Sequence, residues 1–396
     1  MAEIIKSIDP DILDRIRQIR EDLHQHPELA FREKRTAAIV VEQLTKASIE
    51  IVAEGMATTG VVGLLRTSRP GRCVALRADM DALPVEEETQ LAYQSQNPGV
   101  MHACGHDGHC AVLLGAAKVL AGMRDSLCGS VKFIFQPGEE KSEGARLMVE
   151  AGVLTCSQAV QAIFGLHARP QIQAGQIELD VIPNAATNPF QIRIKGQGTH
   201  AAYPHQACDP IAIGSQIVCA LQQVVSRRVA PYEAAVVTVG AFQAGSRGNI
   251  IPDQAILKGT IRTRQPAVQK TVVAAVRSIA TGVARAMGAE CEIEIEPGTP
   301  RLRNDEKLLE LVRQVGAETL GAEDVLEASM ATMGGEDFSQ YLEEQGGVPG
   351  CMFRLGVETD APIHTAKFDF GQAALEPGIL MMSNVAIRYL SDDNQV

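Results

Sequence analysis

Three short apolar runs constrain the fold of this chain more than any other feature of its sequence. They cover residues 72–78 (RCVALRA), 131–135 (VKFIF) and 161–166 (QAIFGL). Short runs of this composition are typical of buried strands. A stretch rich in Ala, Leu and Val at 108–121 separates the first two runs and predicts a helix. Strands that alternate with helices indicate an α/β fold with a mixed sheet and helices on both faces.

The start of the chain predicts one more helix. Asp9 and Pro10 are typical of an N-cap and a first helical position, and apolar residues then recur at Ile12, Ile16 and Ile19. This spacing gives the helix one apolar face, which we expect to pack on the core.

The pattern of elements changes near Thr187, which indicates a second domain. The expected strands and helices, in chain order, are strand 188–195, helix 210–228, strands 234–242 and 255–263, helix 268–287 and strand 290–296. This β-α-β-β-α-β order is the ferredoxin-like split pattern. The 396 residues are enough for two domains. We therefore expect a catalytic domain at 1–186 and 297–396, interrupted by an inserted α+β domain at 187–296.

Charge and hydropathy exclude several classes of function. The formal net charge is −12, and the chain has no block of Lys and Arg residues, so nucleic-acid binding is not expected. The longest apolar stretch, 111–123, contains Lys118 and is too short to span a bilayer. The N-terminal residues lack a basic flank followed by an apolar run, so we expect a cytoplasmic protein. Its nine scattered cysteines predict free thiols.

Residues 101–109 (MHACGHDGH) concentrate three histidines, one cysteine and one aspartate. They directly precede the predicted helix at 108–121, so several of these side chains can converge at its N-terminus. Cys104 and His106 are the expected metal ligands, because a thiolate can bridge two ions and imidazole suits zinc, manganese, cobalt or nickel. The alternative is that side chains such as His109 and Cys110 simply pack on the helix.

Two adjacent glutamates, Glu139 and Glu140, follow the second apolar run in the motif QPGEE. Neighbouring carboxylates at a strand end point in different directions. One can therefore bind a metal ion while the other faces the attacking water, as a metallohydrolase requires. The residues alone allow either assignment, and the alternative is a solvated pair in a turn.

Three further candidates follow strands or lie near the C-terminus. His167 closes the third apolar run, where open α/β sheets place their ligands. Asp79 follows the first run and could orient a ligand or hold a metal, whereas Asp81 could be only a turn residue. His364, in the motif PIHT, would supply the last imidazole of a two-metal site.

Together these motifs resemble the metal-dependent amidohydrolases of the aminoacylase/carboxypeptidase G superfamily. The similarity is greatest to the branch of indole-acetyl-amino-acid hydrolases, hippurate hydrolases and N-acetyl-diaminopimelate deacetylases. The motifs that carry it span nearly the whole chain: HQHPELAFRE (24–33), RADMDALPVEE (77–87), MHACGHDGH (101–109), QPGEE (136–140), His167, GTHAAYPH (198–205), NIIPD (249–253), GGEDF (334–338) and the His364 loop.

The resemblance implies a role for each candidate residue. The implied ligands of a binuclear centre are Cys104, in the bridging position, His106, Glu140, His167 and His364. Glu139 is similar to the family's general base and Asp79 to a carboxylate that orients the site. In the inserted domain, His200 is similar to a residue that reaches the scissile carbonyl when the domains close. Asn249 and Arg262 are similar to groups that hold the substrate's carboxylate.

The implied reaction is hydrolysis of the amide bond of an N-acyl-L-amino acid to a carboxylate and a free amino acid. The implied cofactors are two divalent ions per chain, manganese or zinc, with cobalt or nickel as alternatives. The inserted domain would act as a lid and join two chains in a homodimer. Two other readings stay open: a dipeptidase or carboxypeptidase-like metallopeptidase, and a catalytically inactive binding protein on the same fold.

Overall fold

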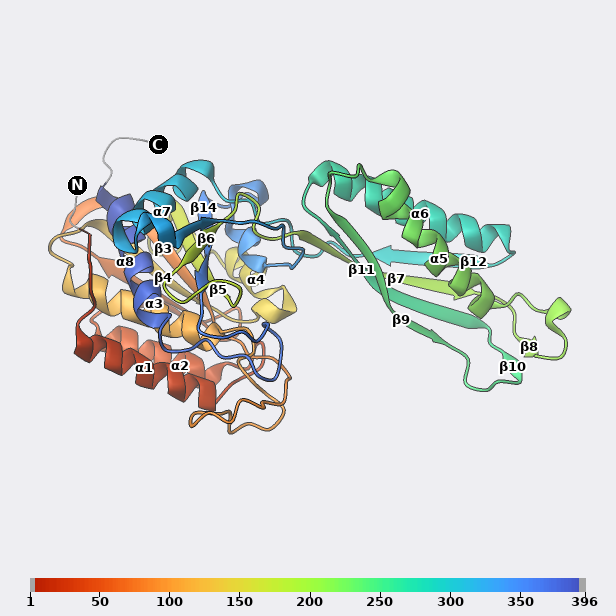
Figure 1. Cartoon of the computed structure of the whole chain (residues 1–396), viewed down its shortest axis with the longest axis horizontal. Helices are drawn as coiled ribbons and strands as arrows, with labels where there is room; N and C mark the ends of the chain where they lie inside the picture. Colours follow the sequence, from red (N-terminus) through yellow and green to blue (C-terminus); the bar gives the residue numbers. More distant parts are fainter. Residues whose placement is uncertain (1–3, 392–396) are drawn as a thin grey trace. The chain divides into compact units, whose positions relative to one another are not determined.

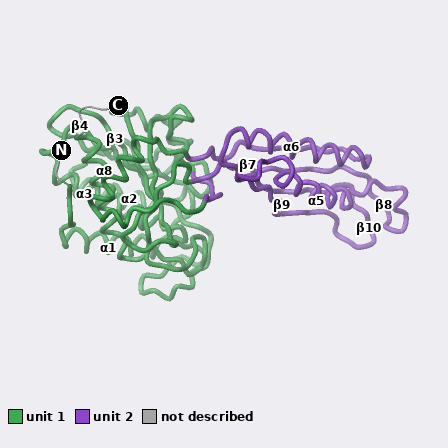
Figure 2. Tube along the Cα trace, turned by 45° about the horizontal axis from the view of Figure 1, so that its top comes forward, with its two compact units in different colours: residues 1–183, 303–330, 337–396 green, residues 184–302, 331–336 purple. Residues whose placement is uncertain are grey.

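A computed structural model of the chain describes residues 4–391, which form two compact units (Figures 1 and 2). Within that range, unit 1 comprises residues 4–183, 303–330 and 337–391, and unit 2 comprises 184–302 and 331–336. Unit 2 contains the whole insertion expected at 187–296 and also the short segment 331–336. Asn184 attaches that segment, because its Nδ2 donates to the carbonyl oxygens of Gly334 (3.3 Å) and Gly335 (3.1 Å).

Unit 1 is built on an eight-stranded mixed sheet with the strand order β1-β2-β4-β3-β5-β14-β6-β13. The bounds of its strands are β1 Glu50–Met56, β2 Gly60–Arg66, β3 Arg69–Asp79, β4 Cys128–Gln136, β5 Ala162–Arg169, β6 Ile177–Leu179, β13 Val325–Glu327 and β14 Gly350–Gly356. β4, β3, β5 and β14 run parallel to one another, and β1, β2 and β6 pair antiparallel with their neighbours β2, β4 and β14.

Both faces of this sheet are covered, as the apolar runs predict. On one face, Val74 and Leu76 of β3 belong to the main core cluster. On the other face, Cys73 and Ala75 of the same strand are also fully buried. A central strand buried on both sides accounts for the continuous apolar run instead of an alternating one. The expected mixed α/β fold is confirmed.

The helices of unit 1 pack on this sheet and on one another. They are α1 Pro10–Gln25, α2 Lys34–Lys46, α3 His106–Gly122, α4 Gly144–Glu150, α7 Glu306–Thr319 and α8 Leu375–Ser391, with short 3-10 helices at η1 Glu139–Lys141, η3 Ala322–Asp324, η4 Asp337–Tyr341 and η5 Glu343–Gln345. α3 and α8 pack on β3, α1 packs on α3, and α2 packs on β1 and β2. Asp9 caps α1 as expected, because its Oδ1 accepts a hydrogen bond from Asp11 N at 2.9 Å.

Unit 2 has the expected β-α-β-β-α-β order. Its elements are β7 Ala186–Lys195, β8 Thr199–His200, η2 Pro204–Gln206, α5 Pro210–Arg228, β9 Ala235–Ala244, β10 Ile250–Ile251, β11 Gln254–Thr263, α6 Pro266–Ala286 and β12 Glu290–Ile295. The antiparallel sheet β12-β7-β11-β9 and the two helices enclose one apolar core. The two-stranded ribbon of β8 and β10 was not expected from the sequence.

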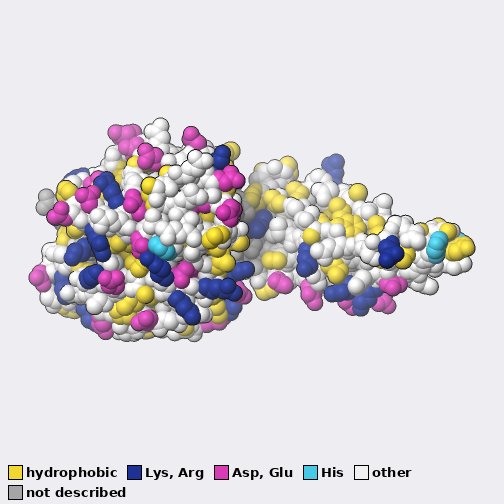
Figure 3. Space-filling model, turned by 90° about the horizontal axis from the view of Figure 1, so that it is seen from below, with side chains coloured by type: hydrophobic (Ala, Val, Ile, Leu, Met, Phe, Trp, Pro, Cys, Tyr) yellow, Lys and Arg dark blue, Asp and Glu magenta, His cyan; other side chains and the backbone are white. Residues whose placement is uncertain are grey.

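The surface fits the charge pattern of the sequence. On the face drawn in Figure 3, cationic and anionic side chains are interspersed over unit 1.

Among residues 4–391, no helix is both long and apolar enough to cross a membrane.

Candidate metal centre

The candidate site lies at the ends of three adjacent parallel strands of unit 1. β3 ends at Asp79, β4 ends just before the QPGEE glutamates, and His167 lies on β5 two residues before its end. Because neighbouring parallel strands end at the same edge of a sheet, these side chains are brought together. α3 starts at the same edge with His106, two residues earlier than the sequence suggested.

Glycines let the chain turn tightly into α3. Gly105, the N-cap, has a φ of +87°, which side chains with a Cβ rarely adopt. A Cβ on Gly108 would lie 2.3 Å from a ring carbon of Phe370, so only glycine fits there. The start of α3 therefore lies directly on the C-terminal segment that carries His364.

Cys104 is in the middle of the predicted ligands. Its Sγ lies 3.5 Å from Nε2 of His167 and 3.3 Å from Nε2 of His364. His364 Nε2 in turn lies 3.4 Å from Oε1 of Glu140. The thiol is buried, and burial together with the charge of Glu140 raises its pKa well above the ordinary value. An ion that binds Cys104 must therefore displace a proton.

Hydrogen bonds orient two of the imidazoles for ligation. Nδ1 of His106 lies 2.8 Å from the carbonyl oxygen of Asp81, and Nδ1 of His167 lies 2.9 Å from that of Ala168. A carbonyl only accepts, so both Nδ1 atoms carry a proton, and Nε2 of each neutral ring has the free lone pair. Burial alone would lower the pKa of His106, but Asp79 raises it well above its ordinary value, so an ion that binds Nε2 must displace a proton. Nε2 of His106 is buried and has no hydrogen-bond partner among residues 4–391.

These donors fit a pair of divalent ions. Cys104 belongs to two groups of mutually close ligand atoms, one with His106 and His167 and the other with Glu140 and His364. Within each group the ligand atoms lie within 4.8 Å of one another. Sulfur and nitrogen bound to one tetrahedral zinc ion would be about 3.6 Å apart. The measured Sγ to Nε2 distances of 3.5 and 3.3 Å are close to that value.

Asp79 is held by the guanidinium of Arg77 and by imidazoles instead of standing free. Its Oδ1 accepts a hydrogen bond from Nδ1 of His109 at 2.6 Å, and its Oδ2 accepts one from Arg77 at 2.7 Å. Burial alone would raise the pKa of this carboxyl, but His106, Arg77 and His109 hold it well below its usual range. Nε2 of His109 accepts from the backbone N–H of Ala168 at 2.9 Å, so His109 has no lone pair left for a metal.

The QPGEE loop is positioned by two buried carboxylates from distant segments. Asp81 accepts hydrogen bonds from the backbone N–H groups of Glu139 (3.0 Å) and Glu140 (2.9 Å). Glu33 accepts one from the backbone N–H of Gly138 at 3.0 Å, and its other oxygen accepts from Thr59. The loop carrying both glutamates is therefore fixed from two sides.

Glu139 and Glu140 are both largely buried, and the neighbours of Glu140 are imidazoles. The Glu139 residue is 9% exposed and the Glu140 side chain is 12% exposed. Burial would raise the pKa of Glu140, but His364 and His106 lower it below its ordinary value. Glu140 is thus an anion that faces imidazoles, as a metal ligand would be.

His364 occupies a strained backbone position. Its φ is +64°, in the left-handed region that residues with a Cβ seldom adopt. Its backbone N–H donates to the carbonyl oxygen of Ala103 at 2.7 Å, directly beside Cys104. Strain of this kind persists where the surroundings fix the residue for a purpose. Here it turns an otherwise exposed imidazole towards Cys104 and Glu140.

The three candidates of the inserted domain lie in unit 2. His200 is exposed on β8, next to Asn249, whose carbonyl oxygen accepts a hydrogen bond from Ala201 N at 3.0 Å. Arg262 is partly buried near the other end of β11, eight residues beyond Gln254. At about 3.4 Å per residue that separation is about 27 Å. One copy of unit 2 therefore does not bring Arg262 together with His200 and Asn249.

Sequence reasoning missed the positioning residues of the site. Asp81 was considered as a turn residue, yet it fixes His106, Glu139 and Glu140 through three hydrogen bonds. Glu33 lies at the end of the motif HQHPELAFRE, 105 positions before the glycine that it binds. Local sequence carried no signal for either role, because Glu33 stands in the charged run REKR and Asp81 closely follows Arg77 and Asp79.

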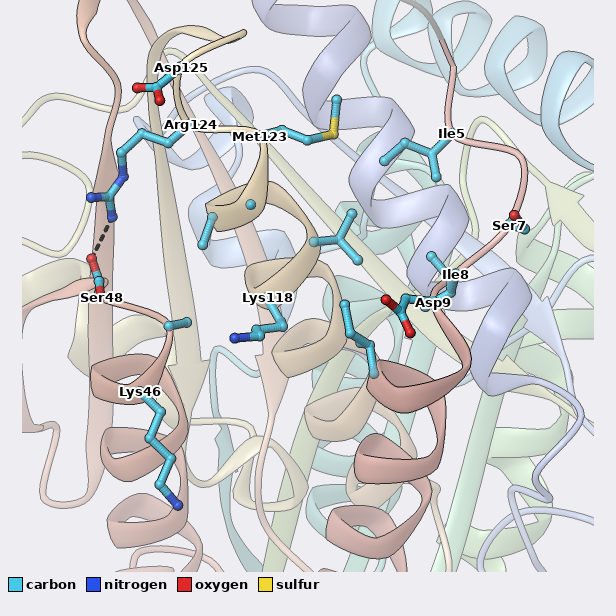
Figure 4. A pocket seen from close by; sticks show the side chains of 15 residues that line it. Ile5, Ser7, Ile8, Asp9, Lys46, Ser48, Lys118, Met123, Arg124 and Asp125 are labelled. Atoms are coloured by element: carbon cyan, nitrogen blue, oxygen red, sulfur yellow. Dashed lines mark hydrogen bonds between the residues drawn. The ribbon is translucent and has the colours of Figure 1, made fainter.

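A hollow of about 640 Å³ lies elsewhere in unit 1 and does not belong to this centre (Figure 4). It is bordered by the start of α1, the end of α2 and the end of α3, including Lys46 and Lys118. α3 has 17 residues, so its two ends are about 25 Å apart. The hollow is thus at the opposite end of the helix from His106.

A buried thiol, imidazoles and carboxylates at the strand ends of a mixed α/β unit define the centre of a metal-dependent hydrolase. The chain matches the sequence model of Peptidase family M20/M25/M40 over residues 75–388 and belongs to that family. The resemblance stated from the motifs is thereby confirmed.

Relatives of known name and structure agree with this assignment. An N-acetylcysteine deacetylase of Bacillus subtilis is 39% identical, over 94% of this chain and 96% of its own length. An N-acyl-L-amino acid amidohydrolase of Geobacillus stearothermophilus is 41% identical, over 77% of this chain and 82% of its own. The crystal structure of the Bacillus subtilis YxeP protein, described as a dinuclear metal binding peptidase from the M20 family, has a TM-score of 0.84. It is 36% identical and covers 96% of this chain and 99% of its own.

Proposed function

We propose that this protein hydrolyses the amide bond of N-acyl-L-amino acids at a centre of two divalent metal ions. The observation that carries the proposal is the position of Cys104, within 3.5 Å of His167 Nε2 and 3.3 Å of His364 Nε2. The deacetylase and amidohydrolase names of its relatives give the reaction class. We propose manganese or zinc as the ions.

The chain's own residues divide into ligands and reacting groups. Cys104 would bridge the two ions, with His106, Glu140, His167 and His364 as the remaining ligands. When bound, the ions would supply a water of lowered pKa and polarise the amide carbonyl. The carboxylate of Asp79, whose pKa is low, would accept the hydrogen bond from His109 and so keep the first turn of α3 in its orientation.

Glu139 would act as the general base and then as the general acid. Its carboxylate accepts the proton of the attacking water and returns it to the leaving amine. The backbone bonds to Asp81 and the neighbouring bond to Glu33 hold its loop still, so that the carboxylate faces the reacting atoms without reorganisation.

His200 would stabilise the developing oxyanion. Its Nδ1 accepts a hydrogen bond from the backbone N–H of Ala202 at 3.1 Å, so the neutral ring carries its proton on Nε2. That exposed N–H is a donor available to a substrate oxygen. Asn249, its neighbour, and Arg262 would bind the substrate's carboxylate.

We further propose a homodimer formed through unit 2. Since Arg262 lies about 27 Å along the sheet from the His200 end, the two cannot contact one small substrate within a single copy of this unit. Two copies of unit 2 could supply His200 and Arg262 to the same site.

We place the protein in the cytoplasm, acting on a small molecule and not on nucleic acid or membranes.

One substrate panel tests the proposal against its rivals. The chain is treated with chelator, reloaded with Mn²⁺ or Zn²⁺ and assayed on N-acetyl amino acids, N-benzoyl amino acids and dipeptides. Metal-dependent turnover of the N-acyl compounds above that of the dipeptides supports the proposal. A preference for dipeptides would make it a peptidase, and binding of all three without turnover would make it an inactive binding protein.

A further inference from the structure

A second cluster of buried charged side chains lies beside the candidate metal centre, and Arg20 of α1 is at its middle. Arg20 is fully buried, and its Nε donates to Asp107 Oδ2 at 2.8 Å. Its NH2 group donates to Asp369 Oδ1. One turn further along α1, His24 Nδ1 lies 2.9 Å from the same oxygen of Asp107, and its Nε2 lies 3.2 Å from Glu87.

The two carboxylates that Arg20 joins belong to the two ligand-bearing segments. Asp107 directly follows His106 in the first turn of α3. Asp369 lies five residues after His364 and 349 positions from Arg20 in the chain. Tyr93 also donates to Asp369, from its hydroxyl to Oδ2 at 3.1 Å. Arg20 is therefore a direct link between the segment of His106 and the segment of His364.

The chemistry of this link depends on a guanidinium. Its planar fork presents separate N–H groups to two carboxylates at once, which a lysine ammonium cannot match in geometry. Burial by itself would lower the pKa of Arg20, but Asp107 and Asp369 raise it above the ordinary value. Removing the cation would leave two carboxylates without their main buried partner, and they would repel each other.

We propose that Arg20 is a positioning residue for the metal centre, and that it sets the separation of His106 and His364 through Asp107 and Asp369. The inference rests on the binuclear centre of the proposed function. A ligand's outer partners typically change metal affinity ten- to a hundredfold. Loss of Arg20 is expected to weaken metal binding by a factor in that range, because the two imidazoles no longer hold their spacing.

The test is a metal titration of the full-length chain, which needs no turnover. Apo protein made with a chelator is titrated with Mn²⁺ and, separately, Zn²⁺ against a chromophoric competitor. The variants are Arg20→Met, Arg20→Lys and Asp369→Asn. Arg388→Met is the matched control, since Arg388 is another mostly buried arginine of unit 1, on α8, bonded to Glu318 at 2.7 Å.

Arg20→Met and Asp369→Asn should each bind at least one ion about tenfold or more weakly, with Arg20→Lys between them and the wild type. The double variant Arg20→Met/Asp369→Asn should be no weaker than Arg20→Met, because both changes break one link. Arg388→Met should lose thermal stability and keep wild-type affinity. If Arg20→Met does not fold, Asp369→Asn decides, because its side chain is 17% exposed and tolerates the change better.

Wild-type affinity for both ions in Arg20→Met and in Asp369→Asn would overturn the inference. So would an equal loss of affinity in Arg388→Met, because that would make the effect a general one of stability. A wild-type chain that binds two ions but turns over no N-acyl amino acid refutes the proposed function alone, and the affinities of the variants still decide the role of Arg20.

Discussion

The carboxylate of Asp81 accepts a hydrogen bond from the backbone N–H of Glu139, with 3.0 Å between Oδ1 and the nitrogen. Its second oxygen binds Glu140 N in the same way, at 2.9 Å. Asp81 is thus an acceptor for two consecutive N–H groups of the loop that carries the proposed base and one proposed ligand. A side-chain amide cannot replace it, because one of its two polar atoms is a donor.

Asp81→Asn should therefore disturb catalysis and metal binding together. One backbone N–H would face an NH₂ group, which costs about 1–3 kcal/mol for a buried unsatisfied group. We expect kcat to fall at least about tenfold and metal affinity to fall with it, as for partners of ligands. Asp209→Asn is the control, because Asp209 also accepts from two backbone N–H groups, at the start of α5 in unit 2. An equal loss of metal in Asp209→Asn would contradict this role.

The adjacent glutamates should fail differently when neutralised. Glu139→Gln keeps the shape of the side chain but cannot accept a proton, so single-turnover rates should fall about a hundred- to ten-thousandfold with metal content unchanged. Glu140→Gln removes an anion that faces His364 at 3.4 Å, so metal should be lost and added metal should restore part of the activity. Metal stoichiometry beside single-turnover rate measures both. If Glu139→Gln loses metal and Glu140→Gln keeps it, the roles are reversed.

The sequence predicted the local elements well because their signals are local. Asp9 and Pro10 do start α1, and the alternation of residues 290–296 appears as alternating exposed and partly buried positions on β12. Four ligand candidates could be found because each stands next to a strand end or helix start: Cys104, His106, Glu140 and His167. His364 lies in the loop between β14 and α8 and was found only through the family resemblance. The strand order could not be read in this way, since β4 is inserted between β2 and β3 by long-range pairing.

The partners of the site depend on contacts across hundreds of positions. The contact of Arg20 with Asp369 and that of Gln136 with Asp337 have no counterpart in local periodicity. Likewise, local sequence could not distinguish a turn residue from a residue that binds a distant loop at Asp81, because both roles need only a short carboxylate after a strand. Arg262 and Asn249 are the reverse case: they are close in sequence but far apart in space. Thirteen positions are close in sequence, but an extended strand converts them into a long distance.

Cys104→Ser should lower metal content as well as turnover. A serine hydroxyl does not ionise as readily as a thiol, so the proposed bridge between two ions would be lost. Cys219→Ser, at an exposed position, should leave both properties unchanged. The measurement is metal per chain after dialysis against trace metal. Two ions per chain and full activity in Cys104→Ser would disprove the bridging role.

His200→Ala should reduce turnover without affecting the metal centre. None of the candidate ligand groups within residues 4–391 includes His200, so metal stoichiometry should equal that of the wild type. Loss of an oxyanion donor typically lowers kcat about a hundred- to a thousandfold. If the proposed dimer places His200 at the neighbouring copy's site, mixing His200→Ala with Glu139→Gln should restore part of the activity. No recovery after verified subunit exchange would refute that arrangement.

The buried pair of His24 and Asp107 should make stability depend on pH. Burial lowers the pKa of His24, but Asp107 and Glu87 outweigh it and raise the pKa from 6.5 to about 9. A group whose pKa is raised on folding contributes stability that is complete below the unfolded value and lost as pH rises through the folded one. The contribution is therefore present below pH 6.5 and disappears by about pH 9. A shift of this size corresponds to roughly 3 kcal/mol.

His24→Gln removes that titration, so the variant tests it directly. Urea unfolding of unit 1 is followed for the chelator-treated wild type and variant at pH 6 and pH 9.5. The difference in free energy of unfolding between the two proteins should shrink by roughly 3 kcal/mol from the lower to the higher pH. Groups common to both proteins cancel in this difference. A difference that is constant with pH would show that His24 is not held in its charged form by Asp107.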